Sequence, residues 1–196
     1  MIITKEWLKI NNACSEGMEY CGQEGLIGLS ADIFVDKLIN LNKLSWANWL
    51  IARALQKFDK VRYAVYAAEK VLPIFEKEYP GDDRPKNAIA AAKAYADYPC
   101  ADTARAADTA ARAADTAYAA ACAADTAYAA AYAAHAASRA AAVAFYAARA
   151  DADAARVEYI VSRAADTAYV AADTDYVAAG EETYIKIIRY GINLLC

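Results

Sequence analysis

Proline and glycine are missing from residues 100–179, and the whole chain of 196 residues has only four prolines and seven glycines. Alternating β-branched runs and Asn-Gly turns are also scarce, which argues against a β-sheet protein. Alanine, the strongest helix former, fills the long segment instead. As one straight helix it would extend roughly 120 Å, too far for a compact domain of this size. We therefore expect an all-α fold, a compact multi-helix bundle or array with a close-packed Ala-rich C-terminal half.

Other absences exclude whole classes of protein. No run of about 18 strongly apolar residues occurs, so a membrane span is not expected. The N-terminus lacks the pattern of a signal peptide, so the expected location is the cytosol. The net charge of −4 argues against binding extended nucleic acid, which needs a basic face. The five cysteines show no Cys-x-x-Cys spacing, and there is one histidine. We therefore expect free, mostly buried thiols, no metal site and no cofactor.

Residues 1–98 show a series of short amphipathic segments with capping residues in front of them. The expected caps are Thr4, Ser15, Ser30 and Ser45. Each places a side-chain oxygen where the first free N–H groups of a helix need an acceptor. A core helix follows, in which Pro73 predicts a kink or a short break. Pro85 suits the first turn of the next helix.

The segment YPGDDRP between these two helices predicts a turn. Gly81 is free there to take a positive φ. Asp82 or Asp83 is expected to cap the next helix, and Arg84 to pair with one of these carboxylates or with Glu76. These roles would all be structural, although Arg84 is kept as a candidate binding residue.

The Ala-rich half has to turn without proline or glycine, and its Asp-Thr pairs are the best candidates for helix starts. Both residue types compete for backbone hydrogen bonds and prefer caps to helix interiors. The pairs are Asp102-Thr103, Asp108-Thr109, Asp115-Thr116, Asp125-Thr126, Asp166-Thr167 and Asp173-Thr174. Some must lie inside helices, because six or seven residues make too short a helix. Asp151 and Asp153 mark another expected break.

We expect one all-helical domain over residues 1–196. It would contain capped amphipathic helices over 1–98, Ala-rich helices over 99–180, and a C-terminal helix or tail over 181–196.

A stripe of larger side chains crosses the Ala-rich half. If residues 118–146 form one helix, steps of three or four place these residues on one face: Tyr118, Cys122, Asp125, Tyr128, Tyr132, His135, Arg139, Val143 and Tyr146. Tyrosine and arginine are favoured anchors of binding sites, so this face is a candidate recognition surface. The alternative is that the tyrosine rings cover the rim of the core with their hydroxyls in water. The full set of candidate binding residues is Tyr118, Tyr128, Tyr132, His135, Arg139, Tyr146, Arg149 and Arg84.

Nothing in the sequence favours catalysis. His135 has only Tyr132, Arg139 and Asp125 as polar neighbours within about three turns of its helix. No Gly-x-Ser-x-Gly or His-Glu-x-x-His motif occurs. We therefore expect a protein that is not an enzyme.

The segment YAAEKVLPIFEKEYPGDDRPKNAIAAAKAYAD carries a motif similar to VLPxFExxxPxDDRPRxAIxAAxxW. In this motif and in the Ala-rich tail that follows, the chain resembles the Imm-5 family of immunity proteins over roughly residues 60–150. The matching residues are Val71, Leu72, Pro73, Phe75, Glu76, Pro80, Asp82, Asp83, Arg84, Pro85, Ala88, Ile89 and Ala91. Lys86 and Tyr95 depart from the pattern, and the tail has fewer histidines. The resemblance implies an all-helical protein associated with toxin neutralisation.

Three functions fit these features. The first is a non-enzymatic immunity or phage counter-defence protein that neutralises a toxin or bacterial immune effector by direct contact. The second is a sponge for a small nucleotide such as a cyclic oligonucleotide, with tyrosines stacking on bases and Arg139 and Arg149 meeting phosphates. The third is a helical scaffold or assembly module, which would form a homo-oligomer. A polar pocket lined by Arg and Tyr favours the sponge, and a broad exposed tyrosine patch favours the antagonist.

Overall fold

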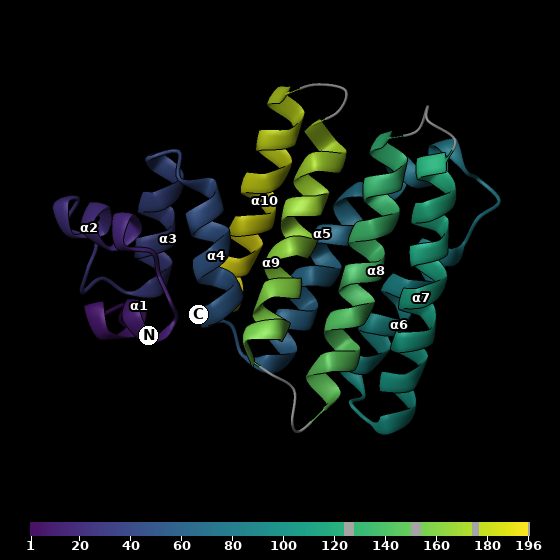
Figure 1. Ribbon diagram of the computed structural model, residues 1–196, viewed down its shortest axis with the longest axis horizontal. Helices are drawn as coiled ribbons and strands as arrows, with labels where there is room; N and C mark the ends of the chain where they lie inside the picture. Colours follow the sequence, from purple (N-terminus) through teal and green to yellow (C-terminus); the bar gives the residue numbers. More distant parts are fainter. Residues whose placement is uncertain (124–127, 150–153, 174–176, 196) are drawn as a thin grey trace.

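Ten α-helices and no β-strand make up the part of the chain that the computed structural model describes, residues 1–123, 128–149, 154–173 and 177–195 (Figure 1). The helices are α1 (Lys5–Ile10), α2 (Ser15–Gln23), α3 (Ala31–Asn40), α4 (Leu44–Ala54), α5 (Lys57–Glu78), α6 (Arg84–Asp97), α7 (Ala101–Ala123), α8 (Tyr128–Ala148), α9 (Ala154–Asp173) and α10 (Val177–Leu195). The predicted all-α fold class is confirmed. The C-terminal helix starts at Val177, before the expected residue 181.

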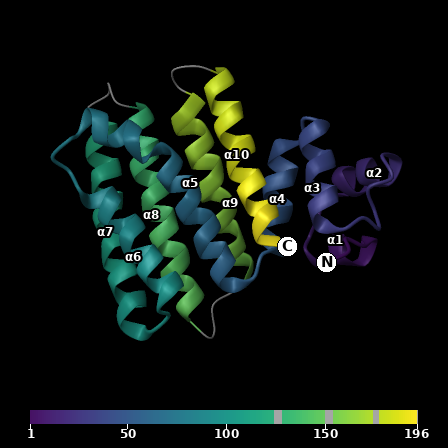
Figure 2. The same cartoon turned by 180° about the vertical axis from the view of Figure 1, so that it is seen from behind.

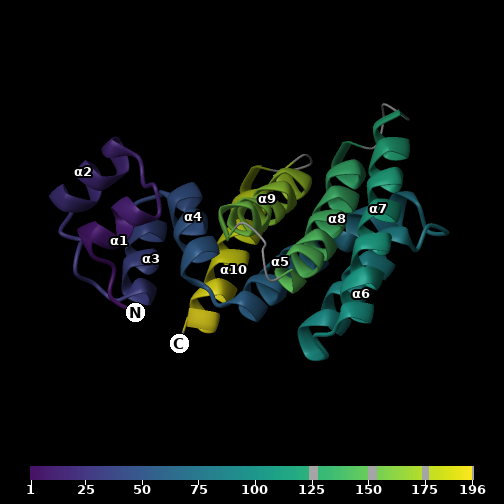
Figure 3. The same ribbon diagram turned by 60° about the horizontal axis from the view of Figure 1, so that its bottom comes forward.

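The helices form an elongated array (Figure 1). Helix α4 packs against α10. The row continues from α10 through α9 and α8 to α7, and each helix packs against the next. Helices α5 and α6 pack together against the other side of α8, as the view from behind shows (Figure 2). Helices α1–α3 lie beyond α4, at the end opposite α6 and α7 (Figure 3). Helices α6 and α7 therefore lie far from the N-terminal helices α1–α3, while α9 packs against α4.

Helix α8 is the centre of the Ala-rich half, with α5, α6, α7 and α9 packed around it. Its buried residues cover most of its circumference: Ala130, Ala131, Ala133, Ala134, Ala136, Ala137, Ser138, Ala140, Ala141, Val143, Ala144 and Ala147. The distance between packed helices depends on the side chains at the contact. Alanine allows a close approach on every side while keeping the best helix propensity. The predicted close packing is thus centred on this helix.

The capping predictions have mixed outcomes. Thr4 accepts a hydrogen bond from the Trp7 backbone N–H at 3.1 Å, as expected. Helix α2 begins one residue early, and Cys14 rather than Ser15 is its cap, with Sγ accepting from Gly17 N at 3.3 Å. Ser30 occupies the N-cap position of α3 without a side-chain cap bond. The prediction for Ser45 is wrong, because α4 already begins at Leu44.

The predictions for proline and glycine also have mixed outcomes. Helix α5 continues through Pro73 to Glu78, so no break occurs at this proline. Gly81 does not take a positive φ. Pro85 lies in the first turn of α6, as expected.

Three of the six Asp-Thr pairs, at 108–109, 115–116 and 166–167, lie inside helices. Some pairs were expected there, and these three do not start helices. Among the pairs that the structure describes in full, Asp102-Thr103 alone stands at a helix start, where Thr103 Oγ1 accepts from Cys100 N at 3.1 Å. Inside helices the threonine hydroxyls donate to carbonyls of the preceding turn, as Thr167 does to Arg163 at 2.5 Å. Asp173 ends α9 instead of starting a helix. Asp125-Thr126, Asp151, Asp153 and Thr174 lie outside the described residues.

The alanine packing around α8 generates a prediction. Ala137 is fully buried in this helix, so Ala137→Leu forces side chains or backbones apart and should lower the free energy of unfolding by about 1–3 kcal/mol. The matched control is Ala106→Leu on the exposed face of α7, which should change it by less than about 0.5 kcal/mol. Urea unfolding followed by circular dichroism measures both. Equal stability of the two variants would contradict the packing around α8.

Candidate binding surface

The tyrosine stripe comes from two helices rather than one. Helix α7 ends at Ala123 and α8 begins at Tyr128, so the expectation of a single helix over residues 118–146 is wrong. Tyr118 nevertheless meets the stripe, because α7 and α8 pack side by side. Its ring stacks on the His135 imidazole with centroids 4.5 Å apart and planes 19° apart.

Tyr128 and Tyr132 extend this cluster along α8. Their ring centroids lie 4.7 Å apart, and their hydroxyls form a 2.8 Å hydrogen bond. This bond raises the pKa of Tyr132 to about 12. Tyr132 also meets Tyr118 edge to face, with centroids 6.5 Å apart. The three rings are thus fixed by one another before any partner binds.

His135 and Arg139 complete the cluster. Arg139 Nε donates to His135 Nε2 at 3.0 Å, so this nitrogen is an acceptor and the imidazole is neutral. Burial lowers the pKa of His135 to about 4, helped by the positive charges of Arg139 and Arg163 and opposed by Asp115. We call the five residues Tyr118, Tyr128, Tyr132, His135 and Arg139 the tyrosine surface. Tyr128 is 61% exposed, while the other four are half-buried.

Two predicted residues lie elsewhere on α8. Tyr146 follows Tyr132 by four turns, roughly 20 Å along the helix axis. Its hydroxyl accepts from Arg156 at 2.6 Å, and the Arg156 guanidinium lies 4.3 Å from the ring centroid. The Arg149 guanidinium lies 6.0 Å from the Phe145 ring. Tyr146 and Arg149 therefore do not join the tyrosine surface.

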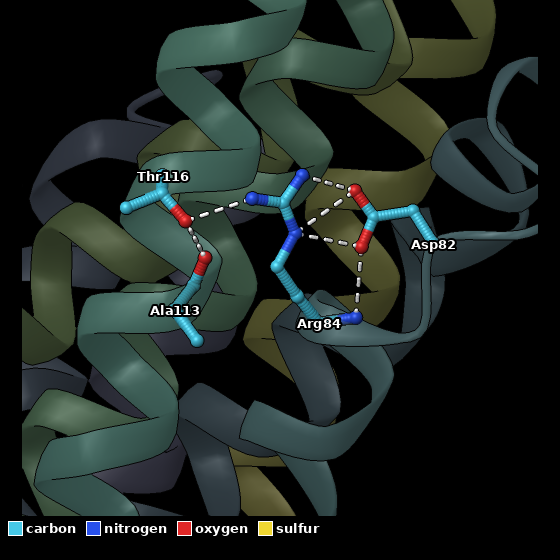
Figure 4. A network of polar contacts seen from close by, with 4 residues as sticks. All are labelled: Asp82, Arg84, Ala113 and Thr116. Atoms are coloured by element: carbon cyan, nitrogen blue, oxygen red, sulfur yellow. Dashed lines mark hydrogen bonds and ion pairs between the residues drawn. The ribbon is translucent and has the colours of Figure 1, made fainter.

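Arg84 is held in a network at the start of α6 (Figure 4). Its Nε donates to both Asp82 oxygens, at 2.8 and 3.0 Å, and its NH1 donates to Thr116 Oγ1 at 2.8 Å. Thr116 in turn donates to the Ala113 carbonyl at 2.6 Å. The bond with Arg84 lowers the pKa of Asp82. Of the alternatives that the sequence left open, Asp82 is the partner, and this network joins the α5–α6 turn to α7.

A polar network through Asn48 was not predicted from the sequence. Asn48 is fully buried on α4. It accepts from the Tyr63 hydroxyl at 2.9 Å and donates to Asp166 Oδ1 at 2.9 Å. Tyr184 donates to the same oxygen at 2.5 Å. These bonds join α4, α5, α9 and α10. The one available signal was a carboxamide within the apolar segment WANWLIARAL.

Two hollows accompany these features. One of about 380 Å³ lies between the N-terminal helices, α4 and α9. A second of about 320 Å³ lies between α5, α6 and α10 and is lined by Arg62, Val65, Tyr66, Glu69, Lys93, Ala96, Asp97 and Tyr190. Neither hollow includes a residue of the tyrosine surface.

The four described cysteines are free thiols, but their expected burial is wrong for three of them. Cys14, Cys100 and Cys122 are exposed and only Cys21 is buried. Burial raises the pKa of Cys21 to about 11. Cys196 lies outside the described residues. Within the described part of the chain no three His, Cys, Asp or Glu side chains gather as a metal site would require.

The fold and the tyrosine surface define an all-α protein with a preformed aromatic face on α7 and α8. The family model described as Immunity protein Imm5 matches residues 51–180. The chain therefore belongs to the Imm5 immunity protein family, which confirms the resemblance and extends it on both sides. No curated protein and no solved structure matches the sequence. None of the described helices combines the length and apolarity that crossing a membrane requires.

The half-buried position of the His135 imidazole predicts the pH at which this side chain titrates. Because burial and nearby cations disfavour its charged form, the His135 signals should titrate near pH 4 rather than near the ordinary value of 6.5. Since the folded-state pKa lies below the unfolded one, the contribution of His135 to stability is present above pH 6.5 and is lost as pH falls toward 4. NMR titration reads this directly, because the chain has one histidine.

Arg139→Met is the matched variant for this titration. It removes the charge beside His135 Nε2 and should move the midpoint back toward 6.5. A wild-type midpoint near 6.5 would mean that the imidazole is not buried as described.

Proposed function

We propose that this protein is a non-enzymatic binding protein that neutralises a protein toxin or a bacterial immune effector by direct contact. The observation that carries the proposal is the tyrosine surface, a group of stacked and hydrogen-bonded rings on α7 and α8. Membership of the Imm5 immunity protein family supports the general role. The proposal includes action in the cytosol and covers both an immunity protein and a phage counter-defence protein.

The geometry of the surface suits protein recognition. Tyr128 projects an exposed ring that contacts Tyr132, Tyr132 meets Tyr118, and Tyr118 stacks on His135. Rings already held in place lose little freedom when a partner binds, which reduces the entropic cost of association. Tyrosine also combines a broad apolar face with a hydroxyl that can pair at an interface.

Charge adds a preference for the partner. The chain carries a net charge of −4, so long-range attraction favours a basic toxin or effector surface. Arg139 keeps its positive charge while it donates to the neutral His135, so the part of the partner opposite Arg139 has to be apolar or acidic. A basic partner with an apolar centre fits this arrangement best.

The second hollow gives the nucleotide-sponge alternative a specific observation, since it is polar and contains Arg62, Tyr66 and Tyr190. The two tyrosine rings stack with centroids 4.0 Å apart. The cations there already have carboxylate partners, however. Arg62 lies 3.0 Å from Asp59, and Lys93 pairs with Glu69. A phosphate ligand would have to compete with these ion pairs, so the protein antagonist is better supported.

The experiment replaces Tyr128 with a photo-crosslinking phenylalanine derivative and irradiates the protein in a host lysate. A matched probe at Tyr159 on α9, which is 58% exposed against 61% for Tyr128, reports contacts made by any exposed aromatic side chain. A toxin or effector should cross-link at position 128 and not at 159. Mass spectrometry of small molecules released on heating tests the sponge in the same preparation.

The identified partner then allows a quantitative test. The double variant Tyr128→Ala and Tyr132→Ala should weaken its binding at least about 30-fold, since truncating an interface anchor costs about 2 kcal/mol or more. Tyr159→Ala should leave binding within about threefold of the wild-type protein, because exposed residues outside an interface contribute little to it. A stably folded double variant that binds and protects as the wild-type protein does would remove the tyrosine surface as the site.

A further inference from the structure

The pocket of about 380 Å³ at the opposite end of the molecule has the form of a small-ligand site. Its residues come from α1–α4 and the turn after α1, with α9 as the floor: Leu8, Asn12, Ala13, Cys14, Gly17, Cys21, Phe34, Leu38, Ser45, Trp46, Trp49, Leu50, Ser162 and Asp166. Asn12, Cys14 and Ser45 are exposed at its mouth. Small-molecule sites have about this size and combine apolar walls with a few polar groups.

Most of this lining lies outside the region that the Imm5 family model matches. The match begins at residue 51, and only Ser162 and Asp166 of the lining residues come after that point. The N-terminal helices thus build the walls of the pocket onto a floor that belongs to the family region. The pocket is a feature separate from the tyrosine surface.

Asp166 supplies the only ionisable carboxylate of the lining, and no lysine or arginine contributes to it. Its Oδ1 accepts from two neutral donors, Asn48 at 2.9 Å and Tyr184 at 2.5 Å. Its Oδ2 forms an ion pair with the partly exposed Arg163, whose Nη1 lies 3.9 Å away, a distance too long for a hydrogen bond, so the hydrogen-bonding capacity of this oxygen is left for a ligand. Burial and the Asp166 charge raise the pKa of the Tyr184 hydroxyl well above its usual value. Tyr184 therefore remains a neutral donor, and an amino group in the pocket would have to share the Asp166 carboxylate only with the ion pair to Arg163.

We propose that this pocket binds a small ligand with an apolar, ring-sized body and a positively charged amino group at one end. The body packs against Trp46, Trp49 and the aliphatic walls, and the amino group donates to Asp166 Oδ2. A charge-assisted hydrogen bond of this kind is stronger than a neutral one. An anion of the same shape meets the carboxylate as a like charge, so the pocket discriminates by charge at its polar end. The proposal does not depend on the proposed antitoxin function.

The test uses three probes with the same apolar body, namely phenylbutylamine, phenylbutanol and phenylbutyrate. Tryptophan fluorescence reports on the pocket because the three tryptophans of the chain, Trp7, Trp46 and Trp49, all lie in α1 and α4. At pH 7.5 the amine should bind at least tenfold more tightly than the carboxylate, with the alcohol between them. Equal affinities for the three, or no saturable signal with the amine, would overturn the proposal.

Two variants test the charge of Asp166 and the space inside the pocket separately. Asp166→Asn keeps an oxygen that can accept from Asn48 and Tyr184, and should reduce the preference for amine over carboxylate to below threefold while alcohol binding is retained. Ser45→Phe places a ring at the mouth and should weaken all three probes at least tenfold. Thr109→Phe adds the same ring to the exposed face of α7 and should change nothing. Amine binding that Ser45→Phe leaves unchanged would place the probe outside the pocket.

A chemical readout checks the same site without mutation. Cys14 is exposed at the mouth, while Cys100 is exposed at the start of α7. Saturating amine should slow alkylation of Cys14 by iodoacetamide at least threefold and leave Cys100 unchanged, as peptide mass spectrometry resolves. Equal rates at Cys14 with and without the amine would contradict binding in this pocket.

Discussion

The close approach of helices around α8 is the constraint on which the rest of the structure depends. Four helices surround this one, and each can do so because the contact side chains are nearly all alanine. Alanine buries little apolar area per residue, so stability here comes from many shallow contacts together with high helix propensity. Larger apolar side chains of the core lie in the earlier helices, such as Phe34 and Phe75, and in α10, which contributes Ile187 and Ile188. The molecule thus joins a conventional core to a densely packed alanine array.

Polar groups connect these two regions at a few buried points. Lys60 on α5 lies 3.0 Å from Glu158 on α9. Within the alanine array itself, Ser138 on α8 donates to Asp115 on α7 at 2.6 Å. Asn48 connects α4 to α9 through Asp166. A buried polar group without its partner is costly. The shape of an alanine face specifies only weakly how two such helices align. These few bonds therefore select the alignment.

Much of the fold was predictable from the sequence, and the failures have physical causes. Helix content and close packing follow from alanine composition and from the length of the segment without breakers. The turns do not, because Asp and Thr can form their side-chain hydrogen bonds within an alanine helix. Thr109 donates to the Arg105 carbonyl, and Asp108 accepts from Arg112. Tyr118 was predicted to share one helix with Tyr132 and His135. It lies on α7 instead and meets them across the contact between α7 and α8. Spacing along one helix and contact between two helices gave the same neighbours. Arg84 was chosen from the DDRP segment, Tyr146 from its spacing in the stripe and Arg149 as a phosphate contact. None of these signals reveals that nearby groups already occupy a side chain.

The pocket escaped the sequence because its lining residues read as ordinary core positions. Trp46, Trp49 and Leu50 match the pattern of an amphipathic helix, and nothing in that pattern shows a space left between helices. The alanine array has the opposite property. An alanine side chain has no rotamers to change, so a shift of α8 cannot be absorbed by side-chain rearrangement. The helices around α8 can therefore adjust to one another only by movements of whole helices, and these include α9 with its pocket residues Ser162 and Asp166.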